Sequence, residues 1–162
     1  MSIVHNVGIA DMKIAKDPDT LITYALGSCV GICVFDSKLK IGGLAHIMLP
    51  YMPSTSSYNS TKLKFADTCI PFMLTEMEKL GCSRMRMAAK IAGGAKMFEV
   101  EGESSIGNIG ERNISAVREI LKKERIKIFA EDVGLNYGRT VSFEVEGGAM
   151  QVRSYAKPLK IL

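Results

Sequence analysis

The chain has 162 residues, of which 47% are hydrophobic and 23% charged, and 21 basic against 17 acidic side chains give it a net charge of +4. This length suits one domain spanning 1–162, and the composition excludes an intrinsically disordered chain. The basic residues are spread along the sequence, so no block of charge indicates a nucleic-acid-binding arm. Neither a signal peptide nor a membrane-spanning stretch is recognisable, so we expect a cytoplasmic protein without direct membrane insertion.

The first third of the chain predicts strands and a hairpin. Residues 3–9 and 20–25 are short segments typical of strands. The segments CVGICVF and KIGGLAHIML flank the turn-prone DSKL, which predicts an antiparallel hairpin over residues 29–49. Residues 50–61 are rich in proline, serine and tyrosine and predict a loop, whose length is typical of functional loops such as lids.

A helix is expected within residues 62–80. Its apolar residues recur at spacings of four and three and therefore share one face, which we expect to pack in the core: Ala66, Ile70, Met73, Met77 and Leu80. Gly81 ends this pattern. Because proline disrupts a helix interior, Pro71 indicates that the regular helix begins nearer Asp67, with the proline close to the first turn.

The second half of the chain adds strands, one helix and a second hairpin. Residues 84–92 predict a strand, residues 107–126 a helix with basic residues at its C-terminal end, and residues 126–132 another strand. The segment TVSFEVEGGAMQV alternates on both sides of Gly147-Gly148 and predicts the hairpin. Because hairpins outnumber crossover units, we expect an α+β sandwich of largely antiparallel or mixed sheets with two covering helices.

The four cysteines are Cys29, Cys33, Cys69 and Cys82. No pair has the CxxC spacing of zinc sites, and the chain has 2 histidines, which argues against a metal site. Disulfides are not expected in a reducing cytosol. We therefore expect the last three of these cysteines to be free thiols that pack as small hydrophobic residues.

Cys29 is the cysteine best placed for chemistry, because LGSC puts it directly after a glycine turn, where a side chain can be exposed and nearby N–H groups can face an oxyanion. His46 lies at the same end of the predicted hairpin, although the sequence does not fix the register. A Cys–His pair needs a third group that orients the imidazole, and Thr23 or Thr20 could supply it. A core thiol beside a core histidine remains an open alternative from these residues alone. We expect a surface or packing role for His5.

Several longer motifs occur together and in order: TYALGSCVGICVFD, GGLAHIMLP, KFADT, KIAGGAKMF, NIGERN, and AEDVG followed by GR. Over nearly its whole length the chain thereby resembles the CheD family, the chemoreceptor glutamine deamidases of bacterial and archaeal chemotaxis. The resemblance implies that Cys29 is the nucleophile, His46 the general acid/base and Thr23 the third catalytic residue. It also implies an α/β sandwich similar to the catalytic domain of cytotoxic necrotizing factor toxins, and no metal or organic cofactor. Leu135 stands where we expect a second glycine, which leaves the shape of that loop open.

The resemblance further implies a reaction at the cysteine. The Cys29 thiolate would attack the side-chain carboxamide of a receptor glutamine, and backbone N–H groups around Gly27 and Ser28 would bind the oxyanion. His46 would protonate the departing ammonia and then activate the water that hydrolyses the thioester to glutamate. Because a thioester also reacts with amines, acyl transfer to an amine is a further possibility.

The implied partners are the cytoplasmic helices of chemoreceptors, which are methyl-accepting chemotaxis proteins, and the chemotaxis phosphatase CheC. A cleft that accepts a glutamine protruding from a coiled coil should be shallow, and its candidate rim elements are residues 50–61 and the glycine loop ending in Met97-Phe98. The alternative from a different class is a non-catalytic adaptor that binds receptors and the phosphatase.

Overall fold

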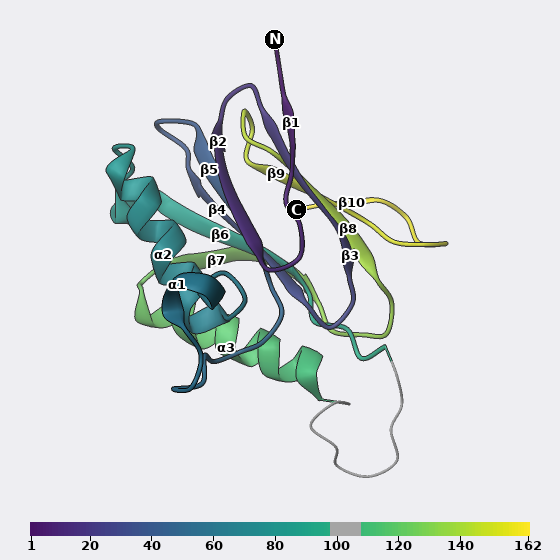
Figure 1. Cartoon of the computed structure of the whole chain (residues 1–162). Coiled ribbons are helices and arrows are strands. Elements are labelled where there is room, and N and C mark those ends of the chain that lie inside the picture. Colours follow the sequence, from purple (N-terminus) through teal and green to yellow (C-terminus); the bar gives the residue numbers. More distant parts are fainter. Residues whose placement is uncertain (98–107) are drawn as a thin grey trace.

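The computed structural model describes residues 1–97 and 108–162 (Figure 1). The elements in chain order are β1 (Val4–Asn6), β2 (Asp11–Lys16), β3 (Thr20–Leu26), β4 (Val30–Asp36), β5 (Ile41–Ile47), α1 (Tyr58–Thr61), α2 (Ala66–Lys79), a 3-10 turn (Arg84–Arg86), β6 (Met87–Gly93), α3 (Ile109–Lys123), β7 (Lys127–Val133), β8 (Arg139–Glu144), β9 (Ala149–Arg153) and β10 (Lys160–Ile161).

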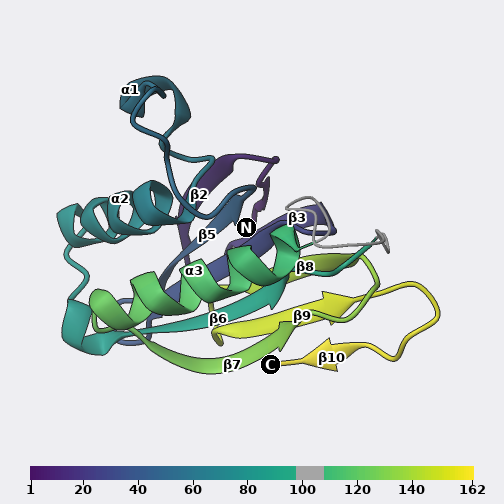
Figure 2. The same ribbon diagram turned by 90° about the horizontal axis from the view of Figure 1, so that it is seen from below.

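The strands form two five-stranded sheets that face each other. The first sheet has the order β1-β3-β8-β9-β10 and the second the order β2-β5-β4-β6-β7. The β1–β3 and β6–β7 pairs are parallel, and the other ladders are antiparallel. Helices α2 and α3 lie side by side across the outer face of the second sheet, which gives a helix–sheet–sheet order (Figure 2). The expected α+β sandwich of mixed sheets with two covering helices is confirmed.

β4 is the middle strand of the second sheet and is buried on both faces, which suits its nearly unbroken apolar sequence VGICVFD. Ile32 packs in the core beneath the helices, whereas Cys33 packs in the core between the sheets. β4 pairs antiparallel with β5 along its whole length, beginning with Val30 opposite Ile47. This register confirms the hairpin predicted over 29–49.

The two long helices cover the second sheet with one apolar face each. The apolar side chains of these faces that are 0% exposed are Ala66, Cys69, Ile70, Met73, Leu74 and Met77 of α2 and Val117 and Leu121 of α3. Each of the larger side chains among these contributes roughly 1.5–3 kcal/mol by leaving water. Leu80, predicted on the same face, directly follows α2 and is 56% exposed, so the prediction for this residue is wrong. α2 begins at Ala66, one residue before the start predicted near Asp67, and Pro71 follows early in the second turn. Within the described residues, no helix is both long and apolar enough to cross a membrane.

Three short elements escape the sequence patterns. β2 has the sequence DMKIAK at the edge of its sheet, and the alternation of charged and apolar residues in it covers only four positions. β10 has only two residues. α1 lies inside the segment predicted as a loop, which is also tied down by a hydrogen bond from the Met52 N–H to Asp67 (2.9 Å). The segment 50–61 is therefore not entirely a loop, because it contains one helical turn.

The loop after β7 contains Leu135, which stands where a second glycine is expected. This residue has a φ of 60°, so a side chain occupies the left-handed region that glycine tolerates best. Its carbonyl accepts a hydrogen bond from the Lys96 N–H (2.8 Å). The side chain itself is 63% exposed. The loop therefore keeps a glycine-like backbone although it lacks the glycine.

This conformation generates a stability prediction. Replacing Leu135 by glycine relieves the clash of a Cβ in the left-handed region, which outweighs the added flexibility of the unfolded chain. We expect Leu135→Gly to raise the free energy of unfolding by about 0.5–1 kcal/mol, measured by urea denaturation. Leu135→Ala keeps the Cβ and should give no such gain. A Leu135→Gly protein less stable than wild type would contradict this account.

Candidate active site

The two sheets bring Cys29, His46 and Thr23 to one end of the sandwich. Thr23 lies on β3 of the first sheet and His46 on β5 of the second, and both side chains are buried. In the β4–β5 ladder His46 is opposite Gly31. Cys29 directly precedes this ladder, and its side chain packs against the core between the two sheets, where Thr23 also contacts His46. Diagonal neighbours on one face have Cα atoms roughly 7–8 Å apart, which lets a thiol and an imidazole approach each other. Gly31 has no side chain to separate them.

Thr23 contacts the imidazole directly. Its Oγ1 lies 2.7 Å from His46 Nδ1 and 2.8 Å from the carbonyl oxygen of Val7. A carbonyl can only accept, so the single hydroxyl hydrogen must point to Val7. His46 Nδ1 must then carry a hydrogen and donate it to Thr23. This pair of contacts assigns the Nδ1–H tautomer and leaves Nε2 of His46 with a free lone pair.

His46 is held in its neutral form by burial. Removal from water lowers its pKa to about 4, and the carboxylate of Asp11, its register partner on β2, opposes this shift only in part. Nε2 is buried and has no hydrogen-bond partner among the described residues. An unpaired buried acceptor costs free energy unless something donates to it. The imidazole is therefore a neutral base whose accepting nitrogen is unoccupied.

Cys29 differs from the other cysteines in its access to solvent. It is half-buried, whereas Cys33, Cys69 and Cys82 are buried, and all four are free thiols. Burial raises the pKa of the Cys29 thiol, and its own backbone N–H partly offsets this. Burial raises the pKa of Cys33 well above its usual range. At neutral pH the site therefore holds a thiol and a neutral imidazole, an arrangement suited to proton transfer during nucleophilic attack.

The turn that carries Cys29 is bound through its carbonyl groups. The carbonyl oxygens of Gly27 and Cys29 accept hydrogen bonds from the N–H groups of Ala95 and Gly94, each at 2.8 Å. The carbonyl of Ser28, between them, accepts one from the Asn113 side chain at 2.9 Å. Three successive carbonyls of the turn thus point into the protein scaffold.

The N–H groups of the same turn are candidates for an oxyanion site. The Gly27 N–H is engaged by the Ala25 carbonyl (3.1 Å). Within the described part of the chain, the N–H groups of Ser28 and Cys29 donate to no backbone carbonyl. In a trans peptide the N–H points opposite to the carbonyl, so these two groups point away from the scaffold that binds the carbonyls. Two backbone donors next to a thiol can stabilise a tetrahedral oxyanion.

The glycine loop after β6 must approach this turn closely. A Cβ on Gly93 would lie 2.3 Å from the Cys29 carbonyl oxygen, and its φ is 113°, so only glycine fits. The Gly134 N–H in turn donates to the Gly93 carbonyl (2.9 Å). The loop of Gly134 is held by Arg139, which is buried and pairs with Asp132 (3.0 Å). The AGG motif therefore lies against the carbonyl side of the cysteine turn, and the EDVG…GR motifs hold the AGG motif in place.

The expected rim elements are only partly described. Met97 lies against the cysteine turn, because a Cβ on Gly27 would be 3.2 Å from its Cγ. Phe98, the other rim residue predicted for this loop, lies outside the described residues. His5 pairs with Asp19 (2.8 Å) on the first sheet, which agrees with a packing role.

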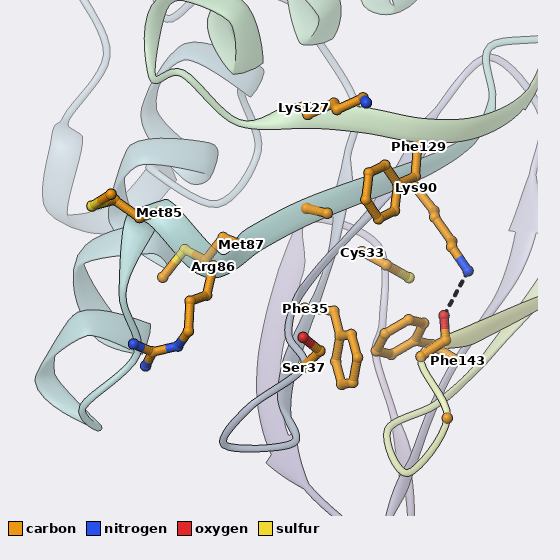
Figure 3. A pocket seen from close by; sticks show the side chains of 13 residues that line it. Cys33, Phe35, Ser37, Met85, Arg86, Met87, Lys90, Lys127, Phe129 and Phe143 are labelled. Carbon is orange, nitrogen blue, oxygen red and sulfur yellow. Dashed lines mark hydrogen bonds between the residues drawn. The ribbon is translucent and has the colours of Figure 1, made fainter.

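An apolar cavity lies away from this site. It has a volume of about 380 Å³ and opens between β6, β7 and the β8–β9 hairpin (Figure 3). Cys33 and Phe129 line it, and Lys90 spans it to donate to the Gly148 carbonyl (2.7 Å). Neither histidine of the chain is among the residues that line it. Across 1–97 and 108–162, no cluster of three or more histidine, cysteine or acidic side chains could hold a metal ion.

Asn113 is the residue of this site to which the sequence analysis assigned no role. It lies in the first half of α3, is fully buried, and donates to the carbonyls of Ser28 and Met48, each at 2.9 Å. The signal that could have found it is its place in the NIGERN motif, where an asparagine occupies the buried face of an otherwise amphipathic helix.

The burial of His46 generates a prediction on pH. Its pKa is lowered in the folded protein, so neutral His46 contributes stability that is present above the unfolded pKa of about 6.5 and is lost as pH falls towards 4. We expect the free energy of unfolding to fall by about 3 kcal/mol over this window. Burial raises the pKa of Asp36, but the hydrogen bonds donated by Arg86 outweigh this and lower it below its ordinary value. The stability that the Asp36 carboxylate contributes is therefore lost only below this pH window.

Denaturant titrations of wild type and His46→Gln between pH 7 and pH 4 measure this effect. The variant lacks the titrating group and should lose most of the slope. An equal slope in both proteins would show that His46 is not the group responsible.

Comparison with known proteins identifies the family of the chain. A family model described as CheD chemotactic sensory transduction matches residues 48–154. The chain is 49% identical to a probable chemoreceptor glutamine deamidase CheD of Syntrophomonas wolfei, with 100% of both chains covered. It is 49% identical to that of Caldanaerobacter subterraneus, with 99% of each covered, and 44% identical to one of Geobacter metallireducens, with 100% of each covered.

Among solved structures, one of a Neisseria meningitidis protein matching family model DUF152 aligns over 82% of this chain and 64% of its own, with 11% identity and a TM-score of 0.48. A likeness this distant bears on no functional question. The family model and the full-length relatives are decisive, and the chain belongs to the CheD family.

Proposed function

We propose that this protein is a protein-glutamine deamidase that converts glutamine side chains of chemoreceptors to glutamate through a Cys29 thioester. The observation that carries the proposal is the contact of Thr23 with His46 and Val7, because it leaves the histidine with a free accepting nitrogen on the face shared with Cys29. The names of the full-length relatives, probable chemoreceptor glutamine deamidases, support the substrate class.

Acylation begins when the Cys29 thiol proton passes to Nε2 of His46 as sulfur attacks the carboxamide carbon of the glutamine side chain. The negative charge on the carboxamide oxygen is bound by the N–H groups of Ser28 and Cys29, and each such donor is typically worth roughly 3 kcal/mol. Gly27 is not an oxyanion donor, because its own N–H already donates to the carbonyl of Ala25, and its carbonyl is fixed by the N–H of Ala95. Imidazolium at His46 then protonates the nitrogen, the C–N bond breaks, ammonia leaves and a thioester remains.

Deacylation repeats the proton transfers with water. His46, neutral again, removes a proton from water as the water oxygen attacks the thioester carbon. Collapse of the tetrahedral intermediate breaks the C–S bond, and His46 returns the proton to sulfur. The net reaction consumes one water, releases one ammonia and leaves a glutamate side chain. Thr23 keeps the imidazole in one tautomer throughout.

The proposed substrates are the cytoplasmic helices of chemoreceptors, which places the reaction in the cytoplasm. Met97, which covers Gly27, is a candidate rim residue for a docked helix. We also propose, on family membership alone, that the protein binds and stimulates the chemotaxis phosphatase CheC. Such binding does not require turnover, so the surface that binds receptors and the phosphatase would also serve a non-catalytic adaptor.

The proposal is tested by incubating receptor helices with the protein in heavy-oxygen water and analysing them by mass spectrometry. We expect glutamate carrying one heavy oxygen at the modified positions, whereas transfer to an amine would instead attach the amine. Cys29→Ala should abolish the conversion, and Thr23→Val should slow it roughly 100-fold because the imidazole loses its orienting group.

Two control variants separate chemistry from folding. Cys33→Ala removes a thiol four residues further along the chain and should retain most activity. Thr23→Ser keeps the hydroxyl and should also retain most activity. Full activity of Cys29→Ala would overturn the assignment. A receptor that binds the protein without any conversion by wild type would favour the adaptor.

A further inference from the structure

Asn113 joins the two segments that carry the thiol and the imidazole. One hydrogen of its amide group is donated to the carbonyl of Ser28, directly before the cysteine. The other is donated to the carbonyl of Met48, two residues after His46. α3 also lies against the glycine loop after β6, because a Cβ on Gly110 would be 2.6 Å from the carbonyl oxygen of Gly94. The helix that covers the sheet thus reaches the site through one buried side chain.

The orientation of the Asn113 amide follows from its partners. Both are carbonyl oxygens, which only accept, so the NH₂ group must face them and Oδ1 must face the other way. Oδ1 is buried and has no partner among the described residues. Burying an unpaired acceptor costs roughly 1–3 kcal/mol, so this side chain is not optimal for stability alone.

The contact with Ser28 fixes one particular peptide plane. The Ser28 carbonyl and the Cys29 N–H belong to the same peptide unit, whose atoms are coplanar and whose C=O and N–H point in opposite directions. A hydrogen bond that fixes the carbonyl therefore also fixes the direction of the N–H. Within the described residues this N–H has no backbone acceptor, and it faces its own thiol sulfur, so a carbonyl oxygen on the carbon that the sulfur attacks would lie beside it.

We propose that Asn113 is a positioning residue that aims the Cys29 N–H at the oxyanion and holds the cysteine turn in register with the strand of His46. This inference rests on the proposed function in assigning Cys29 as the nucleophile. Without Asn113 the Ser28 carbonyl loses its hydrogen-bond donor, and the Cys29 N–H is no longer fixed in direction for the oxyanion. The thiol itself and the Thr23–His46 contact are left intact.

Two reactions of Cys29 distinguish this role from general support of the fold. Acylation by p-nitrophenyl acetate passes through a tetrahedral oxyanion, whereas alkylation by iodoacetamide does not. We expect Asn113→Ala to slow acylation at least about tenfold and to leave alkylation of Cys29 within about twofold of wild type. On receptor helices, kcat for deamidation should fall with KM nearly unchanged.

Val117→Ala is the matched control. Val117 is equally buried one turn further along α3, and its apolar side chain cannot donate a hydrogen bond to the cysteine turn. Val117→Ala should leave the ratio of acylation to alkylation unchanged. If Asn113→Ala does not fold, Asn113→Ser, which can bind only one of the two carbonyls, gives the same comparison.

An unchanged ratio of acylation to alkylation in the folded variant would overturn the role of Asn113. An equal loss of both reactions in Asn113→Ala and Val117→Ala would also overturn it, because helix packing would then be the cause. If wild type is acylated by the ester but does not convert receptor glutamines, the proposed function fails while the ratio still decides the role of Asn113.

Discussion

The hydrogen bond between Thr23 and His46 is the interaction on which the site depends, because it is made across the interface of the two sheets. Thr23 belongs to one sheet and His46 to the other, so the imidazole is oriented only when the sandwich is assembled. Close approach of the sheets is needed elsewhere too: a Cβ on Gly42 would lie 2.5 Å from the ring of Phe143. The packing that brings the two sheets together therefore also orients the imidazole of His46.

The same burial that orients His46 also sets its chemistry. A buried imidazole with a pKa of about 4 is a weak base in the resting protein, and burial keeps the Cys29 thiol protonated. A permanent ion pair between them is therefore disfavoured. Reactivity must instead come from stabilising charge as it develops, which is the task of the turn that Gly94, Ala95 and Asn113 hold by its carbonyls.

Much of this arrangement follows from the sequence, but not its decisive contacts. The hairpin over 29–49 brings Cys29 and His46 to one end of two strands, and the apolar spacing of α2 and α3 predicts which faces they bury. Thr23 could not be distinguished from Thr20 by pattern, because its contact is made between sheets and depends on tertiary packing. Alternation puts Thr20 and Thr23 on opposite faces of β3, but the apolar Leu21 and Ile22 also lie one on each face, so the pattern does not show which face is inward.

Other features were hidden for the same reason. The contact of Asn113 with Ser28 joins residues that are 85 positions apart, and no periodicity encodes such a pair. β2 was missed because its alternation of charged and apolar residues is only four positions long, from Asp11 to Ile14. Leu135 shows that a backbone conformation can persist when the residue that best suits it is absent, since the neighbouring hydrogen bonds hold the loop.

The most direct test of the central claim is the tautomer of His46, measured by nitrogen NMR of the full-length protein at neutral pH. The account predicts a hydrogen on Nδ1 and a bare Nε2, and it predicts that this preference disappears in Thr23→Val but persists in Thr23→Ser. A hydrogen on Nε2 in the wild-type protein would contradict it, because the imidazole could not then accept the proton of Cys29.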